Sequence, residues 1–177
     1  LTHPKVLANV HEEVTDGRRQ VAVKTFSPSP VTHHPSPYLD AVISETLRLY
    51  PAAPAGLRMA TRELEYKGFR IPKGSLLAYS IYATHRQESV FPDALTFKPE
   101  RWLEDKKPDT FDYLPFGYGS RYCIGARLAT TLIKLHLTHL LCHYTLEAAW
   151  SNPIVETGNT VQPKGGLPIR LLLAHKS

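Results

Sequence analysis

The chain has 177 residues, of which 42% are hydrophobic and 21% charged, a composition typical of one globular domain with its own core. The net charge is +5, but the basic residues form no run, which argues against nucleic-acid binding and leaves an acidic protein partner or an anionic membrane surface open. Two cysteines are too few for a disulfide framework and are typical of thiols in a reducing compartment.

The first part of the chain predicts one helix and one loop. Apolar residues recur at helical spacing over 1–15, with Pro4 near the start, and the pair Asp16-Gly17 is expected to end this helix. Residues 17–37 hold four prolines and three serines and are predicted to form a long, mobile loop. No signal peptide or apolar run of about 18 residues is present. Because the chain does not begin with methionine, we expect it to start inside a longer protein.

The clearest amphipathic pattern covers residues 38–50, which are expected to form a helix that Pro51 stops. Its predicted apolar face consists of Leu39, Val42, Ile43, Thr46, Leu47 and Tyr50. Residues 64–80 predict a hairpin followed by a strand, with turns at Lys67-Gly68 and at 72–74.

The second half of the chain contains one more strong helix. A short helix is expected within 80–87, and 87–122 is expected to be mostly irregular. Residues 126–143 have a broad apolar face and predict a largely buried helix. That face consists of Leu128, Leu132, Ile133, Leu135 and Leu140. Residues 144–174 predict short strands around Gly158-Asn159 and Gly165-Gly166.

Cys123 lies in the segment FGYGSRYCIG, residues 116–125, directly before the helix predicted at 126–143. Backbone amides at a helix N-terminus lack partners within the helix, and together with the helix dipole they can stabilise a thiolate. The amides expected to do so belong to Ile124, Gly125 and Ala126. A thiolate stabilised in this way can act as a nucleophile or as a metal ligand.

The residues around the cysteine favour a metal-bearing group that is large and flat. Gly119 and Gly125 let the backbone approach such a group, and Arg121 supplies a cation two residues before the sulfur. Haem has the required shape, iron and anionic propionates. The alternatives are a core cysteine before a helix, with glycines that serve only the turn, and a catalytic cysteine, for which no partner histidine is singled out.

This segment resembles the haem-binding signature of the cytochrome P450 family, Phe-x-x-Gly-x-Arg-x-Cys-x-Gly. Its five fixed positions are filled by Phe116, Gly119, Arg121, Cys123 and Gly125. The resemblance implies haem b as cofactor, Cys123 as the thiolate ligand of its iron, Arg121 on a propionate and Phe116 beside the ligand. It also implies a fold that is mainly α with a small β region, the C-terminal portion of the cytochrome P450 fold.

Two further segments resemble the same family in the expected order. ETLRLYP is similar to its Glu-x-x-Arg helix, and FKPERW is similar to its Pro-Glu-Arg-Phe segment, with Trp102 in place of phenylalanine. The resemblance implies one buried network of Glu45, Arg48 and Arg101 that holds the cysteine loop in place. The alternative is a solvated i,i+3 pair of Glu45 and Arg48.

Other candidate residues are less specific. Arg58 lies where family members often place a second propionate-binding arginine, and its alternative is a solvated strand residue. Residues 52–56 and 158–161 resemble segments that line the substrate pocket. Three histidines share one helix face and could bind a metal, although a polar edge of the helix explains them as well. They are His136, His139 and His143, and Cys142 on the same helix is interpreted as a core thiol.

The resemblance implies a haem-thiolate monooxygenase that inserts one oxygen atom of dioxygen into a hydrophobic small molecule. Electrons would come from an NAD(P)H-linked reductase or a ferredoxin-type donor, docked by basic residues such as Arg127 and Lys134. Two alternatives stay open: a haem-thiolate isomerase, dehydratase or peroxygenase, and a truncated, non-catalytic fragment.

A complete family member is more than twice as long as this chain. We therefore expect residues 1–177 to be the haem-ligating C-terminal part of one catalytic domain, without the distal helix, and inactive alone. No catalytic residue is assigned. Membrane association through a missing N-terminus is possible for eukaryotic members, in the endoplasmic reticulum or mitochondria, whereas bacterial members are cytoplasmic.

Overall fold

The computed structural model describes residues 3–22, 36–105, 107–149, 155–157 and 160–173. The helices in these residues are α1 (Pro4–Ala22), α2 (Pro37–Leu49), α3 (Ile81–Thr84) and α4 (Ala126–His143). The strands are β1 (Ala55–Met59), β2 (Leu64–Tyr66), β3 (Phe69–Ile71), β4 (Leu76–Ser80), β5 (Tyr144–Ala148), β6 (Val155–Thr157), β7 (Val161–Pro163) and β8 (Ile169–Leu173). None of the helices found among the described residues has the length and hydropathy of a membrane span.

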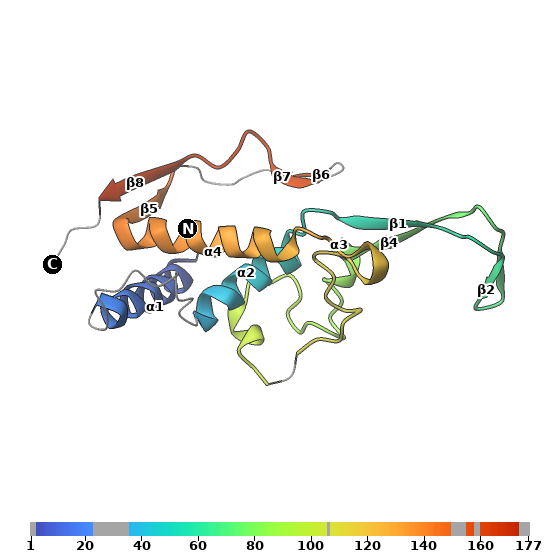
Figure 1. Cartoon of the computed structure of the whole chain (residues 1–177), viewed down its shortest axis with the longest axis horizontal. Helices are drawn as coiled ribbons and strands as arrows, with labels where there is room; N and C mark the ends of the chain where they lie inside the picture. The colour runs from blue at the N-terminus through green and yellow to red at the C-terminus, as the bar shows by residue number, and fades with distance from the viewer. Residues whose placement is uncertain (1–2, 23–35, 106, 150–154, 158–159, 174–177) are drawn as a thin grey trace.

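The helices form one packed layer, and the strands extend from it (Figure 1). α4 runs across the middle of the molecule, α1 and α2 pack along one side of it, and β5 and β8 lie near its C-terminal half on the opposite side. All four sheets are antiparallel and two-stranded, pairing β1 with β4, β2 with β3, β5 with β8 and β6 with β7. The predicted combination of helices with a small β region is therefore present.

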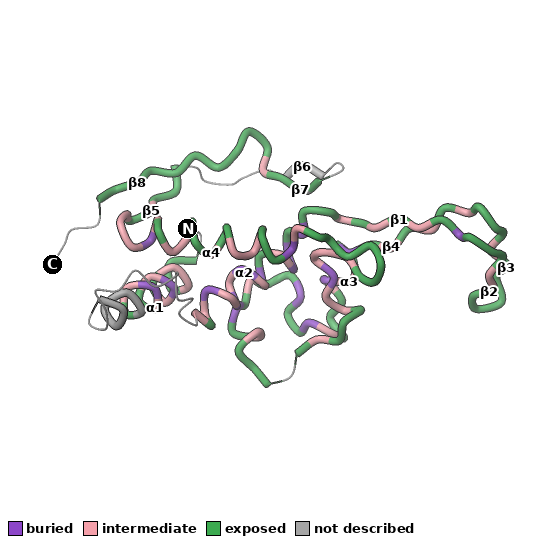
Figure 2. Tube along the Cα trace, viewed as in Figure 1, coloured by how far each residue is buried: buried purple, intermediate pink, exposed green. Residues whose placement is uncertain are grey.

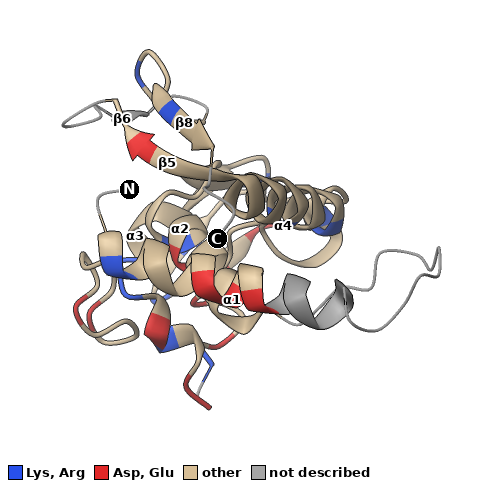
Figure 3. Ribbon diagram, turned by 90° about the vertical axis from the view of Figure 1, so that its left-hand side faces the viewer, with Lys and Arg blue, Asp and Glu red and all other residues tan. Residues whose placement is uncertain are grey.

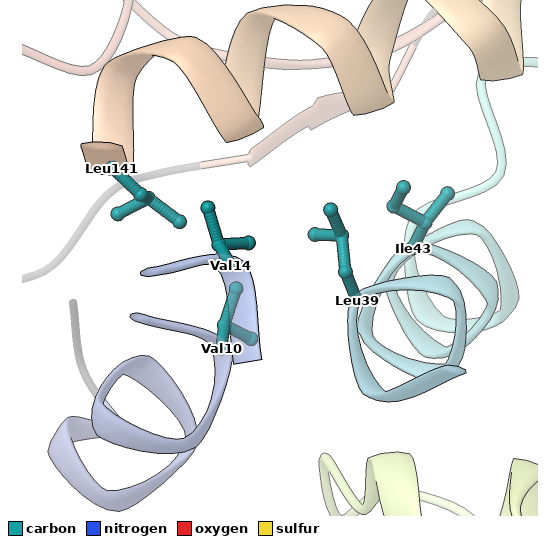
Figure 4. Close-up of a cluster of buried hydrophobic side chains, with 5 residues drawn as sticks. All are labelled: Val10, Val14, Leu39, Ile43 and Leu141. Carbon is teal, nitrogen blue, oxygen red and sulfur yellow. The ribbon is translucent and has the colours of Figure 1, made fainter. Parts of the chain in front are cut away.

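The core lies where α1, α2 and α4 meet. Its buried side chains come from all three helices and point toward one another (Figure 4): Val10, Val14, Leu39, Ile43 and Leu141. Burial is concentrated in the helical layer, whereas the strands are largely exposed (Figure 2). Leu39 and Ile43 of the apolar face predicted for 38–50 thus enter the core that positions α2, whereas Thr46 and Tyr50 of that face are exposed.

α1 also stabilises the start of α2 through a carboxylate. The Glu13 side chain accepts hydrogen bonds from the amides of Tyr38 and Leu39, both at 2.9 Å. Ser36, at the N-cap, makes no side-chain capping bond. Glu13 therefore supplies from another helix the acceptor and the negative charge that a helix N-terminus favours.

The prediction that α1 ends at Asp16-Gly17 is wrong, because the helix continues to Ala22. One glycine inside a helix costs only about 1 kcal/mol relative to alanine, and the arginines and glutamine that follow it are good helix formers. The prediction of a loop over 17–37 is consequently wrong at both of its ends. Residues 17–22 belong to α1, α2 begins at Pro37, and residues 23–35 lie outside the described part of the chain.

α4 has the predicted boundaries, but the prediction that it is largely buried is wrong. Its fully buried residues are Ala126 and Leu141, whereas Leu128 is 64% exposed. Leu132, Ile133 and Leu135 are also exposed. The apolar stripe of α4 is wider than the area that α1 and α2 cover, so one apolar face of α4 remains open in this chain.

The 55–80 region forms a long ribbon that leaves the helical layer near the cysteine loop. β1 and β4 pair from Ala55–Ser80 to Met59–Leu76, and the β2–β3 hairpin lies at the far end (Figure 1). Lys67 and Gly68 have φ values of 48° and 80°, as a tight two-residue hairpin turn requires. The turn predicted at Lys67-Gly68 is confirmed, whereas strand β1 was not singled out from the sequence.

The packing predicts which leucines determine stability. Leu39→Ala removes a side chain that is 1% exposed and should lower the free energy of unfolding by about 2–5 kcal/mol. Leu128→Ala is the matched control on α4 and should change it by less than about 0.5 kcal/mol, since that side chain is exposed. Urea denaturation followed by circular dichroism measures both, and equal losses would contradict this account of the core.

Candidate functional site

Cys123 lies in an exposed loop that backbone hydrogen bonds close on itself. The Cys123 amide donates to the Phe116 carbonyl and the Tyr122 amide to the Gly119 carbonyl, both at 3.0 Å. The Cys123 side chain is exposed, whereas Cys142 on α4 is half-buried. The alternative of a core thiol at position 123 is therefore excluded, and the sulfur is accessible to a large ligand.

Two glycines give the loop its shape. Gly117 and Gly119 have φ values of 73° and 69°, in the left-handed region that other residues rarely adopt. A Cβ added to Gly119 would meet no atom within 4 Å, so the loop is open on that side. A Cβ added to Gly125 would lie 3.8 Å from the Cys123 sulfur, an ordinary contact, so the atoms of this chain do not themselves demand glycine there.

The amides at the start of α4 are arranged partly as expected. The Ala126 amide donates to the Cys123 carbonyl at 3.2 Å, so the prediction that it is unpaired is wrong. This bond forms because the chain makes a tight turn before the helix begins. Within the described residues, the amides of Ile124 and Gly125 have no hydrogen-bond acceptor. These two amides remain available to a sulfur ligand or to another acceptor.

Two arginines lie beside the loop. Arg121 is exposed and forms no ion pair with the described residues. Arg58, on β1, is half-buried, donates to the Tyr118 carbonyl at 3.4 Å and lies 5.5 Å from the centre of the Tyr79 ring. The β1–β4 ribbon thus brings a second cation to the cysteine loop, which sequence position alone only suggested.

Tyr79 explains why glycine occupies position 56. Gly56 faces Tyr79 across the β1–β4 pair, and a Cβ added to Gly56 would fall 2.1 Å from the Tyr79 ring. The Tyr79 hydroxyl also lies 3.8 Å from the position of a Cβ added to Gly117. Part of the segment predicted to line a substrate pocket, 52–56, is therefore shaped by packing of the ribbon. Of the other such segment, 158–161, residues 158 and 159 lie outside the described part.

Glu45 and Arg48 are both completely buried in α2, which excludes the alternative of a solvated pair. The Arg48 Nε and Nη2 atoms donate to the two oxygens of Glu45, each at 2.9 Å. The Lys98 amide donates to Glu45 Oε1 at 2.9 Å, and Arg101 Nε to the same oxygen at 3.1 Å. One carboxylate therefore joins α2 to the 98–102 turn and is shared by two guanidinium groups.

Every N–H donor of Arg48 has an acceptor. Besides Glu45, the guanidinium donates to the carbonyls of His85 and Ala94 at 2.7 Å and of Thr96 at 3.2 Å. Five donors in one rigid plane are a property of arginine that lysine lacks. Arg48 thus fixes the segment between α3 and the 98–102 turn, a role that motif spacing did not show.

Trp102, at the position where the resembling family segment has phenylalanine, joins this network. Its indole N–H donates to Glu45 Oε2 at 2.9 Å, and its ring lies 4.5 Å from the ring of Tyr113. The Tyr113 hydroxyl in turn donates to the Ser44 carbonyl at 3.0 Å, and burial raises its pKa. The substitution of tryptophan for phenylalanine therefore adds a donor to the buried carboxylate.

His85 is the residue of this region that sequence reasoning missed. It is completely buried, and its Nδ1 lies 3.1 Å from the Arg48 carbonyl while its Nε2 accepts from the Leu114 amide at 2.8 Å. Burial lowers its pKa to about 4, and the charges of Arg48 and Arg86 act in the same direction. The pattern ATHRQ gave no signal, because a histidine in a short helix is compatible with any exposure.

The histidines of α4 do not form a metal site. Nδ1 of His136 and Nδ1 of His143 each lie 2.7 Å from the carbonyl four residues earlier. No cluster of three or more metal-ligating side chains occurs among the residues that the structure describes. The polar edge of the helix is the alternative that agrees with this geometry.

The buried network predicts that two Glu–Arg pairs contribute very different amounts to the free energy of unfolding. Glu45→Gln and Arg48→Lys should each lower the free energy of unfolding by about 3–5 kcal/mol, because each leaves a buried charge incompletely paired. Glu63 and Arg70 form a 2.7 Å pair whose side chains are 53% and 77% exposed. The same two substitutions there should cost less than about 1 kcal/mol. Denaturant unfolding of the four variants checks this, and comparable losses at both pairs would contradict it.

The stability of the fold should fall as the pH falls from 6.5 to 4. The folded state holds His85 neutral with a pKa of about 4, so over this range the unfolded chain binds more protons. The expected loss is on the order of 3 kcal/mol. The His85→Gln variant should not show this loss of stability between pH 6.5 and 4. Hydrogen bonds from Arg48, the Lys98 amide and Trp102 outweigh burial and lower the pKa of Glu45, so a second loss follows below pH 4.5.

Urea midpoints at pH 7, 5.5, 4.5 and 3.5 measure both contributions, the first three that of His85 and the last that of Glu45. An unchanged midpoint between pH 7 and 4.5, or an equal decline in the glutamine variant, would count against a buried neutral His85.

Comparison with known proteins identifies relatives of this chain. The family model described as Cytochrome P450 matches residues 1–168. The chain is 40% identical over 135 residues to Cytochrome P450 26A1 of Danio rerio, covering 75% of this chain and 27% of that protein. It is 39% identical over 143 residues to the mitochondrial 25-hydroxyvitamin D-1 alpha hydroxylase of Mus musculus, covering 80% and 28%. Thromboxane-A synthase of Sus scrofa is 40% identical over 141 residues, covering 77% and 26%.

Solved structures show the same fold. Retinoic acid-bound cyanobacterial CYP120A1 has a TM-score of 0.81 at 28% identity, over 98% of this chain and 40% of that one. The haem domain of cytochrome P450DA has a TM-score of 0.83 at 25% identity, over 99% and 38%. The chain spans about a quarter of the length of the curated relatives that it matches. By its match to the family model over nearly its whole length, this chain belongs to the cytochrome P450 family.

Proposed function

We propose that this chain is the haem-ligating, C-terminal part of a haem-thiolate monooxygenase, with Cys123 as the ligand of the haem iron. The observation that carries the proposal is the exposed Cys123 sulfur directly before α4, in a loop whose amides of Ile124 and Gly125 are unpaired among the described residues. Membership of the cytochrome P450 family supports haem b as the cofactor and oxygen insertion as the chemistry.

The residues present are compatible with haem. The loop is open beside Gly119, where no atom of the chain lies within 4 Å of an added Cβ, so a flat group can approach the backbone. Arg121 has no ion-pair partner among the described residues, and Arg58 reaches the same loop from β1. In the proposed complex these two cations hold the propionates, and Phe116 lies beside the ligand.

The residues beside the Cys123 sulfur suit its proposed role as the ligand of the haem iron. A cysteine binds iron as the thiolate, and in the proposal the amides of Ile124 and Gly125, directly before α4, donate hydrogen bonds to the bound Cys123 sulfur. When bound, haem supplies the iron that binds and activates dioxygen, and thiolate ligation promotes O–O cleavage. The network around Glu45 and Arg48 holds the loop and takes no direct part in this chemistry.

The rest of the catalytic domain lies outside this chain in the proposal. The relatives are about three times as long, and the chain exposes an apolar face on α4 that includes Leu128, Leu132 and Leu135. We propose that the amino-terminal remainder of the domain covers this face and provides the distal wall of the haem pocket. The hydrophobic substrate would bind between the two parts, so the isolated chain is expected to be inactive.

A reaction without external electrons is the second candidate. The relatives include a hydroxylase and also Thromboxane-A synthase, so they represent more than one class of reaction. An isomerase, dehydratase or peroxygenase would use the same Cys123 ligand. Turnover that continues without NAD(P)H and its redox partner would favour this candidate over a monooxygenase.

A reductase or ferredoxin-type donor is the proposed partner of the monooxygenase. α1 carries acidic residues, whereas α4 carries Arg127 and Lys134 (Figure 3). Lys134 is already paired with Asp40, which weakens its predicted docking role, while Arg127 is exposed. The mitochondrial hydroxylase among the relatives supports the mitochondrion as the compartment to examine first.

Cys123→Ser tests the ligand assignment. In the full-length protein that contains this chain, the ferrous carbon-monoxide complex should show the thiolate-type Soret band, and Cys123→Ser should abolish it because a serine hydroxyl is not ionised at neutral pH. Cys142→Ser is the matched control and should keep the band, since that thiol lies on α4 away from the loop. A thiolate-type band that survives in the Cys123 variant would overturn the proposed function.

Arg127→Glu tests the donor surface. Reversal of this charge should slow reduction by the electron donor about tenfold at low salt and reduce the salt dependence of the rate. Arg70→Glu, on the distant β3 strand, is the control and should leave the rate unchanged. Stopped-flow reduction over a range of salt concentrations measures both, and identical rates in the two variants would remove α4 from the docking surface.

A further inference from the structure

We propose that His85 is a positioning residue that connects the buried Glu45–Arg48 network to the cysteine loop and thereby keeps Cys123 in place as a thiolate ligand. The proposal rests on the proposed function, because it concerns the ligand of the haem iron. No motif of the cysteine segment contains His85, which lies 38 residues before Cys123 in the sequence, at the end of the short helix α3.

His85 is held on three sides by the two parts that it connects. Its Nδ1 lies 3.1 Å from the Arg48 carbonyl, and its own carbonyl accepts a hydrogen bond from Arg48 Nη1 at 2.7 Å. Its Nε2 lies 2.8 Å from the Leu114 amide nitrogen. The side chain is completely buried, so no water replaces a bond that is lost.

Leu114 connects His85 to the cysteine loop through backbone hydrogen bonds. Its carbonyl accepts from the Gly117 amide at 3.0 Å, and the neighbouring Phe116 carbonyl accepts from the Cys123 amide at 3.0 Å. A continuous series of hydrogen bonds and short chain segments therefore runs from Arg48 through His85 and Leu114 to Cys123. Glu45 and Arg101, by contrast, make no hydrogen bond to the cysteine loop among the described residues. The connection from the buried network to the loop therefore passes through His85.

The direction of the hydrogen bonds fixes the tautomer of His85. A carbonyl can only accept, so Nδ1 carries the proton toward Arg48, and a backbone amide can only donate, so Nε2 must be unprotonated toward Leu114. Protonation of the ring would set an N–H against the Leu114 amide and break the link. The surroundings oppose protonation, since the ring is buried and faces the cations of Arg48 and Arg86.

The other ionisable groups near the ring do not reverse this preference. Tyr113 lies 5.2 Å from His85 between ring centres, and burial raises its pKa, so it is neutral. Glu45, on α2, is neutralised by its bonds with Arg48 and Arg101. The neutral ring with its proton on Nδ1 is therefore the form that this site accepts.

A pair of amide substitutions separates positioning from simple filling of the core. The side-chain amide of asparagine occupies the place of the imidazole Nδ1, and that of glutamine reaches the place of Nε2. His85→Asn therefore keeps the bond to the Arg48 carbonyl and loses the one to Leu114, whereas His85→Gln keeps an acceptor for the Leu114 amide. Both variants replace the buried ring by an open-chain amide and lose one hydrogen bond. If His85 had a purely structural role, the two variants would therefore lose similar amounts of stability and of the thiolate-type band.

The experiment uses the full-length, haem-loaded protein that contains this chain. The fraction of the ferrous carbon-monoxide complex that shows the thiolate-type Soret band is measured from pH 3.5 to 8, beside the free energy of unfolding. We expect His85→Gln to retain most of the thiolate-type band and His85→Asn to lose at least half of it at pH 7.5. His136→Asn and His136→Gln, on the exposed edge of α4, are the controls and should leave the band unchanged.

The outcomes distinguish the two proposals. If the unmodified protein shows no thiolate-type band, the proposed function fails. If it does and the two His85 variants keep or lose the band equally, the positioning role of His85 is wrong. In the unmodified protein, acidification should reduce the thiolate-type band as His85 gains a proton. His85→Gln should lack this acid-induced loss of the band.

A measurement on the unmodified protein decides the case if neither variant folds. With ¹⁵N-labelled histidine, the shifts of His85 should show a protonated Nδ1 and an unprotonated Nε2 at pH 7.5, with a coupling from Nε2 to the Leu114 amide. A proton on Nε2, or the absence of that coupling, would overturn the link.

Discussion

The carboxylate of Glu45 is the group on which the arrangement of this chain depends. A charge that is completely buried is costly unless its oxygens are hydrogen-bonded and its charge is matched. Here Arg48 and Arg101 match the charge, and the Lys98 amide and the Trp102 indole complete the hydrogen bonding. Because these donors come from α2 and the 98–102 turn, the carboxylate is satisfied only when both segments are correctly placed.

Arg48 extends this constraint beyond its ion pair. Its remaining donors bind the carbonyls of His85, Ala94 and Thr96, which belong to an otherwise irregular segment. Phe91 and Ala94 of this segment are buried, and directional bonds to a rigid guanidinium fix the course of its backbone. Buried ionic groups add little net stability compared with apolar packing, but they select one geometry. A loop that must present one sulfur in one position benefits from that selectivity.

The boundaries of α2 and α4 and the cysteine motif were accessible from the sequence because they depend on local patterns. α2 and α4 lie within one residue of their predicted limits, and Cys123 stands where the signature puts it. The exposure of α4 was not accessible, since a wide apolar stripe shows that a face can be buried and not which partner buries it. Neither was the capping of α2 by Glu13, which depends on how two helices pack.

The buried polar groups show the same limit more sharply. Glu45 and Arg48 have the spacing of an ordinary surface pair, and only the resemblance to a family pointed to a buried network. His85 carried no signal, because its two bonds reach Arg48 and Leu114, residues that are 37 and 29 positions away. Histidine is informative once its partners are known, since each ring nitrogen must then either donate or accept.

The distribution of burial supports a division of labour within the proposed domain. The side of the cysteine loop toward α2 is tightly bonded through Leu114, His85 and Arg48, whereas the face of α4 that includes Leu128 is open. An apolar surface of this kind on a stable fold usually marks an interface. In the proposed function, this chain thus holds the Cys123 sulfur on the side toward α2 but does not itself enclose a hydrophobic substrate. On that proposal, selection of the substrate depends mainly on the polypeptide proposed to cover α4, and the chemistry of the iron depends on the residues around Cys123.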